Sequence, residues 1–286
     1  MTRLYSRKGV RENVVDLTDN AGYDGYPISF YKSGTAPEAA GRFYSWGKDA
    51  GYPGAWAPGT PGLSGRATDG TAAADLGCLP YKNATTGSNY LAAFSATASV
   101  ACQLYLIDVL WVNSGIAVAT LTAQTINSVT FPARDRDGST NGVDVQVGIL
   151  VTAATTNAGA ITGTTLSYTN SGGTGSRTGT ITAVGGFPAT GVVGTLVPFE
   201  LAAGDVGVRS IQSITLTTSY AGGSISLVAY RKIAAASCLL ANVGSAGAVY
   251  VPPGVKLYNG SCLMPIGLMS ATTATVISGM ASIVER

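Results

Sequence analysis

Histidine is absent from this chain of 286 residues, and charged side chains make up only 11% of it. Without histidine, neither a Ser-His-Asp triad nor a Cys-His pair can be built. Beyond residue 75 the acidic residues are few and scattered, whereas a glycosidase needs two carboxylates held at a fixed separation. We therefore expect a protein that is not an enzyme.

The chain also lacks a charge excess, because 17 basic residues face 15 acidic ones and the net charge is +2. A protein that binds nucleic acid through electrostatics needs a basic face. The one basic cluster comprises Arg3, Arg7, Lys8 and Arg11, and we expect no specific nucleic-acid partner. A surface with so few charges is poorly protected against association. This composition predicts that much of the surface is covered in an assembly.

Long hydrophobic runs are missing as well. The longest apolar run, Leu104–Val112, contains Asp108 and is about half the length of a membrane-spanning helix. The first residues are basic but are not followed by the apolar segment of a secretory signal. We expect no membrane partner and synthesis in the cytoplasm.

Cysteine is sparse, with Cys78, Cys102, Cys238 and Cys262 forming two pairs that are each 24 residues apart. Four buried free thiols are common in a cytoplasmic product. The alternative is disulfide bonds, formed within the chain or after exposure to an oxidising exterior. Zinc is not indicated because the chain has no C-x-x-C pair and no histidine. We expect no cofactor.

Residues 1–75 combine aromatic side chains with frequent glycine and proline. Proline and glycine disfavour a long helix or a central strand, but free linkers are poor in aromatic residues. We interpret this segment as an extended, irregular N-terminal arm that docks on a partner, with Tyr44, Trp46, Tyr52 and Trp56 as its anchors. An irregular part of the same globule and a sugar-binding aromatic platform are the alternatives.

Residues 76–286 show sequence patterns that are typical of a β domain. The run Leu104–Val112 is apolar on both faces, and Val143–Val151 alternates with period two. Ser213–Lys232 is interpreted as a hairpin around Ala221–Gly223. Strands at roughly ten-residue spacing with glycine-rich turns predict an all-β fold of the β-sandwich or jelly-roll kind. Strands in 238–286 either close this sandwich or pair with a neighbouring subunit.

The segment Ala133–Gly142 carries oxygen-bearing side chains at alternate positions, as in the first part of a calcium loop. These are Asp135, Asp137, Ser139 and Asn141. The same residue types are ordinary turn formers, and a turn without metal is the preferred interpretation. Calcium binding remains the alternative.

Three stretches are distinctive as strings: VLWVNSGIAVATLTAQTINSVTFPARDRDGSTNG, SYTNSGGTGSRTGT and PFELAAGDVGVRSIQSITLTTSYAGGSISLVAYR. Through these stretches, which lie within about Val109–Lys232, the chain resembles virion structural proteins of tailed bacteriophages and prophages. The resemblance covers under half of the chain and carries no catalytic signature, so it assigns no active residue.

This resemblance implies a virion protein that is made in the host bacterial cytoplasm. The first expectation is a decoration or cement protein that binds the major capsid protein on the head exterior and forms homo-oligomers, with a trimer favoured. A neck, tail or baseplate component is the second expectation. A receptor- or glycan-binding module is the third.

Overall fold

A computed structural model describes residues 25–35, 39–182, 185–245, 248–249 and 254–286. Within these residues, the helical elements are two single turns, η1 (Trp46–Lys48) and η2 (Ala73–Asp75), and all other elements are strands. The described part of the chain contains no helix that is long and apolar enough to cross a membrane. The predicted all-β class is confirmed.

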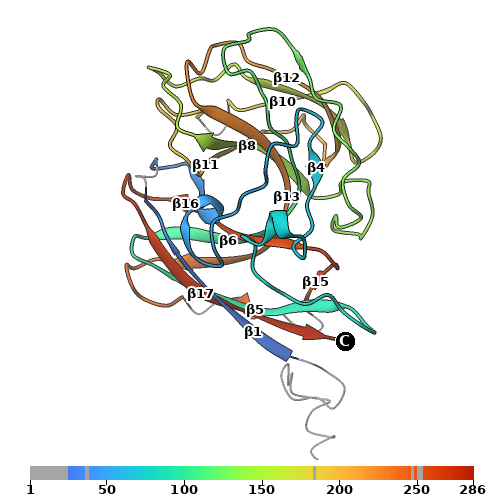
Figure 1. Ribbon diagram of the computed structural model, residues 1–286, viewed down its shortest axis with the longest axis vertical. Coiled ribbons are helices and arrows are strands. Elements are labelled where there is room, and N and C mark those ends of the chain that lie inside the picture. Colours follow the sequence, from blue (N-terminus) through green and yellow to red (C-terminus); the bar gives the residue numbers. More distant parts are fainter. Residues whose placement is uncertain (1–24, 36–38, 183–184, 246–247, 250–253) are drawn as a thin grey trace, which may run out of the picture.

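Six strands close into a barrel at the centre of the molecule (Figure 1). They pair in the order β13-β8-β11-β2-β16-β6, and β6 pairs again with β13. Their bounds are β2 (Phe43–Ser45), β6 (Cys102–Val112), β8 (Val145–Ala153), β11 (Thr195–Pro198), β13 (Ser224–Cys238) and β16 (Cys262–Met269). The short β4 (Arg66–Ala67) pairs with β6. One buried cluster takes residues from five of these strands, among them Ile107, Val109, Leu150, Leu196, Val228, Tyr230, Met264 and Ile266.

A second sheet covers the lower part of the barrel in Figure 1, in the order β14-β5-β17-β1-β3, with β15 also on β5. The bounds are β1 (Gly25–Ser33), β3 (Ala50–Tyr52), β5 (Asn89–Ala98), β14 (Ala248–Val249), β15 (Val255–Leu257) and β17 (Val276–Glu285). Its inner face packs on Leu104 and Leu106 of β6 and on Ala234 and Ala236 of β13. The rings of Phe30 and Phe94 stack at 5.9 Å. A Cβ at Gly279, between them on β17, would lie 2.4 Å from the Phe30 ring.

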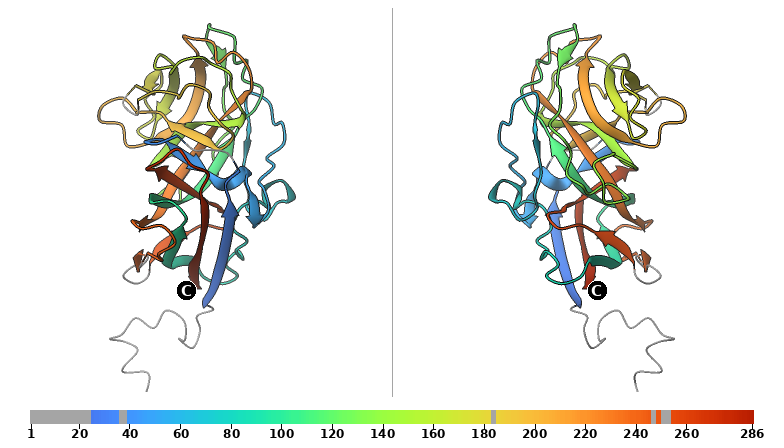
Figure 2. Two further views of the ribbon diagram at one scale, coloured as in Figure 1. Left: turned by 90° about the vertical axis from the view of Figure 1, so that its left-hand side faces the viewer. Right: turned by 90° about the vertical axis from the view of Figure 1, so that its right-hand side faces the viewer.

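A third sheet covers the upper part, in the order β10-β9-β12-β7. Its strands are β7 (Gln124–Thr125), β9 (Thr165–Asn170), β10 (Arg177–Thr180) and β12 (Val208–Thr215). The core between this sheet and the barrel is built of buried residues that all lie between Leu110 and Ala229. The molecule is therefore two β-sandwiches that share the barrel as their middle layer, and Figure 2 shows the elongated outline that results.

The strand patterns in the sequence are partly confirmed. The alternating run became β8, and the run that is apolar on both faces became β6, which faces the barrel interior on one side and an outer sheet on the other. The predicted hairpin over Ser213–Lys232 is wrong. There β12 pairs with β9 and β7, whereas β13 pairs with β8 and β6. The apolar residues of β12 and β13 contact the same core from two different sheets. The alternation of apolar and polar residues in both strands is therefore explained without hydrogen bonds between them.

The segment predicted as an arm divides at residue 25. Residues 1–24 lie outside the described residues. Between residues 25 and 75 the chain supplies β1, β2, β3 and β4 to the sheets, so this part belongs to the same globule. In the C-terminal tail, β16 pairs with β2 and β6, and β17 pairs with β1 and β5. These C-terminal strands thus close the fold within the chain.

Candidate functional site: a disulfide-linked polar cluster

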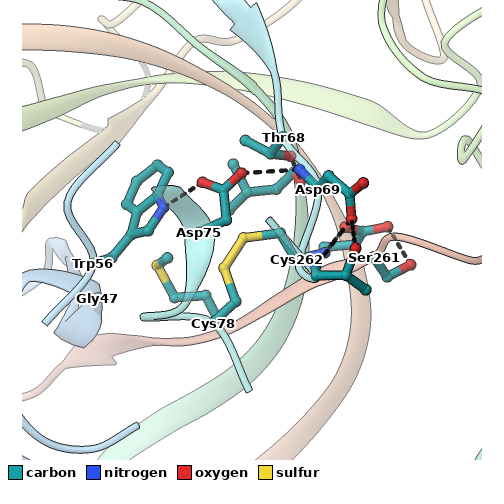
Figure 3. The surroundings of a disulfide bond; sticks show 12 residues. Gly47, Trp56, Thr68, Asp69, Asp75, Cys78, Ser261 and Cys262 are labelled. Carbon is teal, nitrogen blue, oxygen red and sulfur yellow. Dashed lines mark hydrogen bonds between the residues drawn. A yellow bond between two sulfur atoms is a disulfide. The ribbon is translucent and has the colours of Figure 1, made fainter. Parts of the chain in front are cut away.

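Two buried carboxylates and a disulfide lie together beside the barrel, where residues 54–80 run past the start of β16 (Figure 3). Asp75 is at the end of η2 and is fully buried. Its carboxylate accepts hydrogen bonds from the indole Nε1 of Trp56 at 2.7 Å, from both terminal nitrogens of Arg66 at 2.7 and 2.8 Å, and from the amide of Asp69 at 2.9 Å. Burial opposes ionisation, but these donors outweigh it and lower the pKa of Asp75.

Glycine allows this packing. A Cβ at Gly77 would lie 2.2 Å from the Cα of Trp56, so the turn after η2 and the Trp56 backbone approach one another only because position 77 has no side chain. The Trp56 amide also donates to the carbonyl of Gly47 at 2.6 Å. The indole is thereby fixed with its nitrogen toward Asp75 and its ring in the core that lines the barrel.

The second carboxylate, Asp108, lies in the middle of β6 and is also fully buried. It pairs with Arg134 at 3.2 Å and accepts from the hydroxyl of Ser261 and the amide of Cys262, both at 2.8 Å. Arg134 also donates to the carbonyls of Thr68 and Val109, at 2.8 and 2.9 Å. A buried ion pair is tolerated only when its remaining donors and acceptors are satisfied, and this one is.

The disulfide joins Cys78 to Cys262 across 184 residues, with the Cα atoms 5.2 Å apart. Cys78 follows Asp75 by three positions, and the amide of Cys262 binds Asp108. The bond therefore ties the two carboxylate clusters together. Every carboxylate oxygen in them already accepts a hydrogen bond. This arrangement holds four chain segments together, namely residues 56–78, β6, the loop at Arg134 and Ser261–Cys262, and it leaves neither carboxylate without hydrogen-bond donors.

A groove lies elsewhere, between β8, the segment Phe199–Val206 and Lys232, with a volume of about 630 Å³. Its acidic residues include Asp205, which Arg177 holds at 2.9 Å, while Tyr168 and Asn170 also donate to it. These hydrogen bonds, with that of Arg177 the strongest influence, lower the pKa of Asp205 to about 2. Such a carboxylate stays ionised at neutral pH and has no proton to give as a general acid.

Comparisons with known proteins give no family for the chain. No protein-family model matches it, and no curated protein does. Among solved structures, the chain is similar to the VP2 subviral particle protein of infectious bursal disease virus, with 10% identity, a TM-score of 0.20, and coverage of 92% of this chain and 81% of that one. T=1 particles derived from the same virus give 10% identity and a TM-score of 0.19, with 92% and 78% covered. Likenesses this low carry no argument about function.

The four predicted docking anchors are placed very differently. Tyr44, Trp46 and Trp56 are buried in the cores of this chain, with 1% or less of their surface exposed. The interpretation of these three rings as anchors for a partner is wrong, because their apolar area is already covered intramolecularly. The Trp46 indole even donates to the carbonyl of Thr275 at 3.1 Å. Tyr52, in contrast, is 58% exposed.

The acidic loop is organised around one side chain. The Asp135 carboxylate accepts from the amides of Asp137, Ser139, Gly142 and Val143 at 2.6 to 3.0 Å, and from the Ser139 hydroxyl. Asp137 instead pairs with Arg136 at 2.9 Å, and the Ser139 hydroxyl accepts from the amide of Asn141. The side chains of Asp135, Asp137 and Ser139 are thus engaged with the loop itself, and Asn141 takes part through its backbone amide. Within the described residues, no group of three or more metal-ligating side chains gathers.

The cysteines divide in a way that the spacing did not predict. Cys78 and Cys262 are bonded, and Cys102 and Cys238 face one another as register partners on β6 and β13. The Cys102 side chain hydrogen-bonds that of Cys238, which lowers the pKa of Cys238. Both side chains are buried.

Proposed function

We propose that this chain is a structural protein of a tailed-phage particle that binds the outer capsid surface and stabilises the head. The main support is that the resembling stretch and one buried core of the fold cover the same part of the chain. The stretch that resembles such virion proteins, about Val109–Lys232, includes every buried residue of one core. The resemblance therefore coincides with a packed unit rather than with isolated loops.

An exposed apolar loop supports the proposal. Leu239, Leu240 and Val243 are 78%, 65% and 51% exposed. The loop is fixed to the second sheet, because the amides of Asn242 and Ser245 donate to carbonyls of β5 at 2.7 and 2.9 Å. Large exposed apolar side chains on a fixed loop are typical of a protein contact. In the proposal, this loop is the contact with the capsid surface.

The sugar-binding alternative loses its main support, since Trp46 and Trp56 are buried. The neck, tail and baseplate alternatives differ from a decoration protein in copy number. Localisation in a reconstructed particle separates them: hundreds of copies per head are expected for a decoration protein, and on the order of a dozen for a ring at the neck or tail. Absence of the chain from purified particles would refute the whole proposal.

Binding can be tested with matched variants. Phage heads that lack this protein are mixed with purified protein and sedimented. Leu240→Asp is expected to lower the fraction of protein that cosediments with the heads, because a charge would then be buried in the contact. Leu121→Asp is the control, since Leu121 is also exposed, at 50%, but lies outside this loop. Equal cosedimentation of the two variants would remove the loop from the proposal.

A further inference from the structure

The sheet formed by β5, β17, β1 and β3 has an outer face that carries no charge. Direct register partners lie on the same face of a sheet, and the pairings place Tyr31 beside Tyr52 and Ser278, and Met280 beside Ser29 and Ser95. We define the outer face by the ten residues that these pairings bring together: Pro27, Ser29, Tyr31, Tyr52, Ala93, Ser95, Thr97, Ser278, Met280 and Ser282.

The charged residues of β1 and β17, Lys32 and Glu285, do not belong to the outer face. Lys32 points inward, where its ammonium group donates to the carbonyl of Gly54 at 2.9 Å and is fully buried. Glu285 lies at the end of β17 and accepts from the amides of Thr85 and Thr86. An exposed antiparallel sheet face normally carries polar and charged side chains, whereas depletion of charge marks the centre of a protein interface.

The outer face is also stepped. Tyr31, Tyr52 and Met280 protrude at one end and in the middle, with 49%, 58% and 41% of their surfaces exposed. At the other end, Pro27, Ser282 and Ala93 form a row of small side chains. There β1 is the edge of the sheet among the described strands, because β3 pairs only with Tyr31–Ser33. A raised end and a low end of similar width lie on one surface.

We propose that the outer face is an interface with a second copy of this chain, related by a two-fold axis that runs across the strands through the row Ser29, Met280 and Ser95. Rotation about that axis places the raised end of each copy, with Tyr31, against the low end of the other copy, with Pro27. Met280 then lies opposite Met280 of the second copy. A two-fold contact brings each residue near its own counterpart or a symmetry-related one. A charged patch would repel its own copy, whereas an uncharged one is compatible with itself.

The size of the outer face sets the expected strength. Four strands about 4.8 Å apart and three rows of side chains about 7 Å apart cover on the order of 400 Å² per copy. Stable pairings bury about 800 Å² per partner. An interface of this size is typical of weak, transient pairings, so sedimentation equilibrium over a wide range, from about 5 µM to 500 µM, is the suitable measurement.

The test places charge on the axis. Met280→Lys brings two like charges together and is expected to leave a 28.8 kDa monomer at every concentration, and Met280→Glu should do the same. An equimolar mixture of the two variants is expected to dimerise again, because each lysine then meets a glutamate. Rescue by opposite charge does not occur when a variant has merely misfolded.

The control is Leu240→Lys, whose exposed side chain lies in the loop after β13 and outside the outer face. It should associate as the wild type does. The inference is overturned if the wild-type chain is monomeric up to 500 µM, if Met280→Lys associates like the wild type, or if the mixture stays monomeric. It does not depend on the virion role, since self-association is measured without any particle.

Discussion

Reduction of the Cys78–Cys262 disulfide is expected to cost much of the stability of the fold. The bond closes a span of 184 residues, and the loop-closure relation gives about 5 kcal/mol at 25 °C for a loop of that length. Measured values for disulfides are commonly about 2–4 kcal/mol. We therefore expect a loss of the free energy of unfolding between about 2 and 5 kcal/mol, mainly through a less restricted unfolded chain.

The assay is equilibrium unfolding in urea with and without a phosphine reductant. The reduced chain should unfold at lower urea and with a steeper slope, because an unlinked unfolded chain exposes more surface. A Cys78→Ala/Cys262→Ala variant should match the reduced wild type and should not respond to reductant. Cys102→Ala/Cys238→Ala should keep the response. A loss below about 1 kcal/mol, or a response that persists in the first variant, would refute the reasoning.

Three further outcomes are expected. Asp108→Asn should lower the free energy of unfolding by about 3–5 kcal/mol, because Arg134 then stays buried without its anion; adding Arg134→Met should recover part of the loss in thermal melts. Burial lowers the pKa of Lys32 to about 8, so the unfolded state binds the proton more tightly between pH 8 and 10.5. Stability should rise by about 1–2 kcal/mol between pH 7.5 and 9.5 after allowance for solvent screening, and Lys32→Met should abolish the rise in urea titrations at both pH values. Asp135→Ala should make the loop after Arg134 sensitive to trypsin, whereas a variant still resistant in timed digests would show that the loop holds without its carboxylate.

Those parts of the fold that repeat a local pattern were predictable from the sequence. The alternation that became β8 follows from a strand with one face toward the barrel interior and the other toward the upper core. The long apolar run of β6 follows from burial on both faces. In contrast, the pairing of β13 with β8 and β6 joins segments far apart in the chain, and no local pattern distinguishes it from a hairpin with β12.

The polar cluster could not be predicted for a related reason. Asp108 stood out only as a charge inside an apolar run, and its partner Arg134 lies in a loop rich in turn-forming residues. The bond between Cys78 and Cys262 depends on the approach of two segments 184 residues apart. Trp46 and Trp56 were misjudged because glycine and proline around them hide any period, although both rings are buried by distant strands.

The distribution of the two outer cores along the chain has a consequence for synthesis. The upper core needs no buried residue beyond Ala229, so it can assemble while later residues are still being added at the ribosome. The lower core joins Ile28 and Phe30 to Ile277 and Ile283, and β17 lies between β1 and β5. β1 therefore lacks the strand that pairs along its whole length until about 250 further residues have been translated. During that interval we expect β1 to be accessible to chaperones, and slower translation before β17 should increase the aggregated fraction.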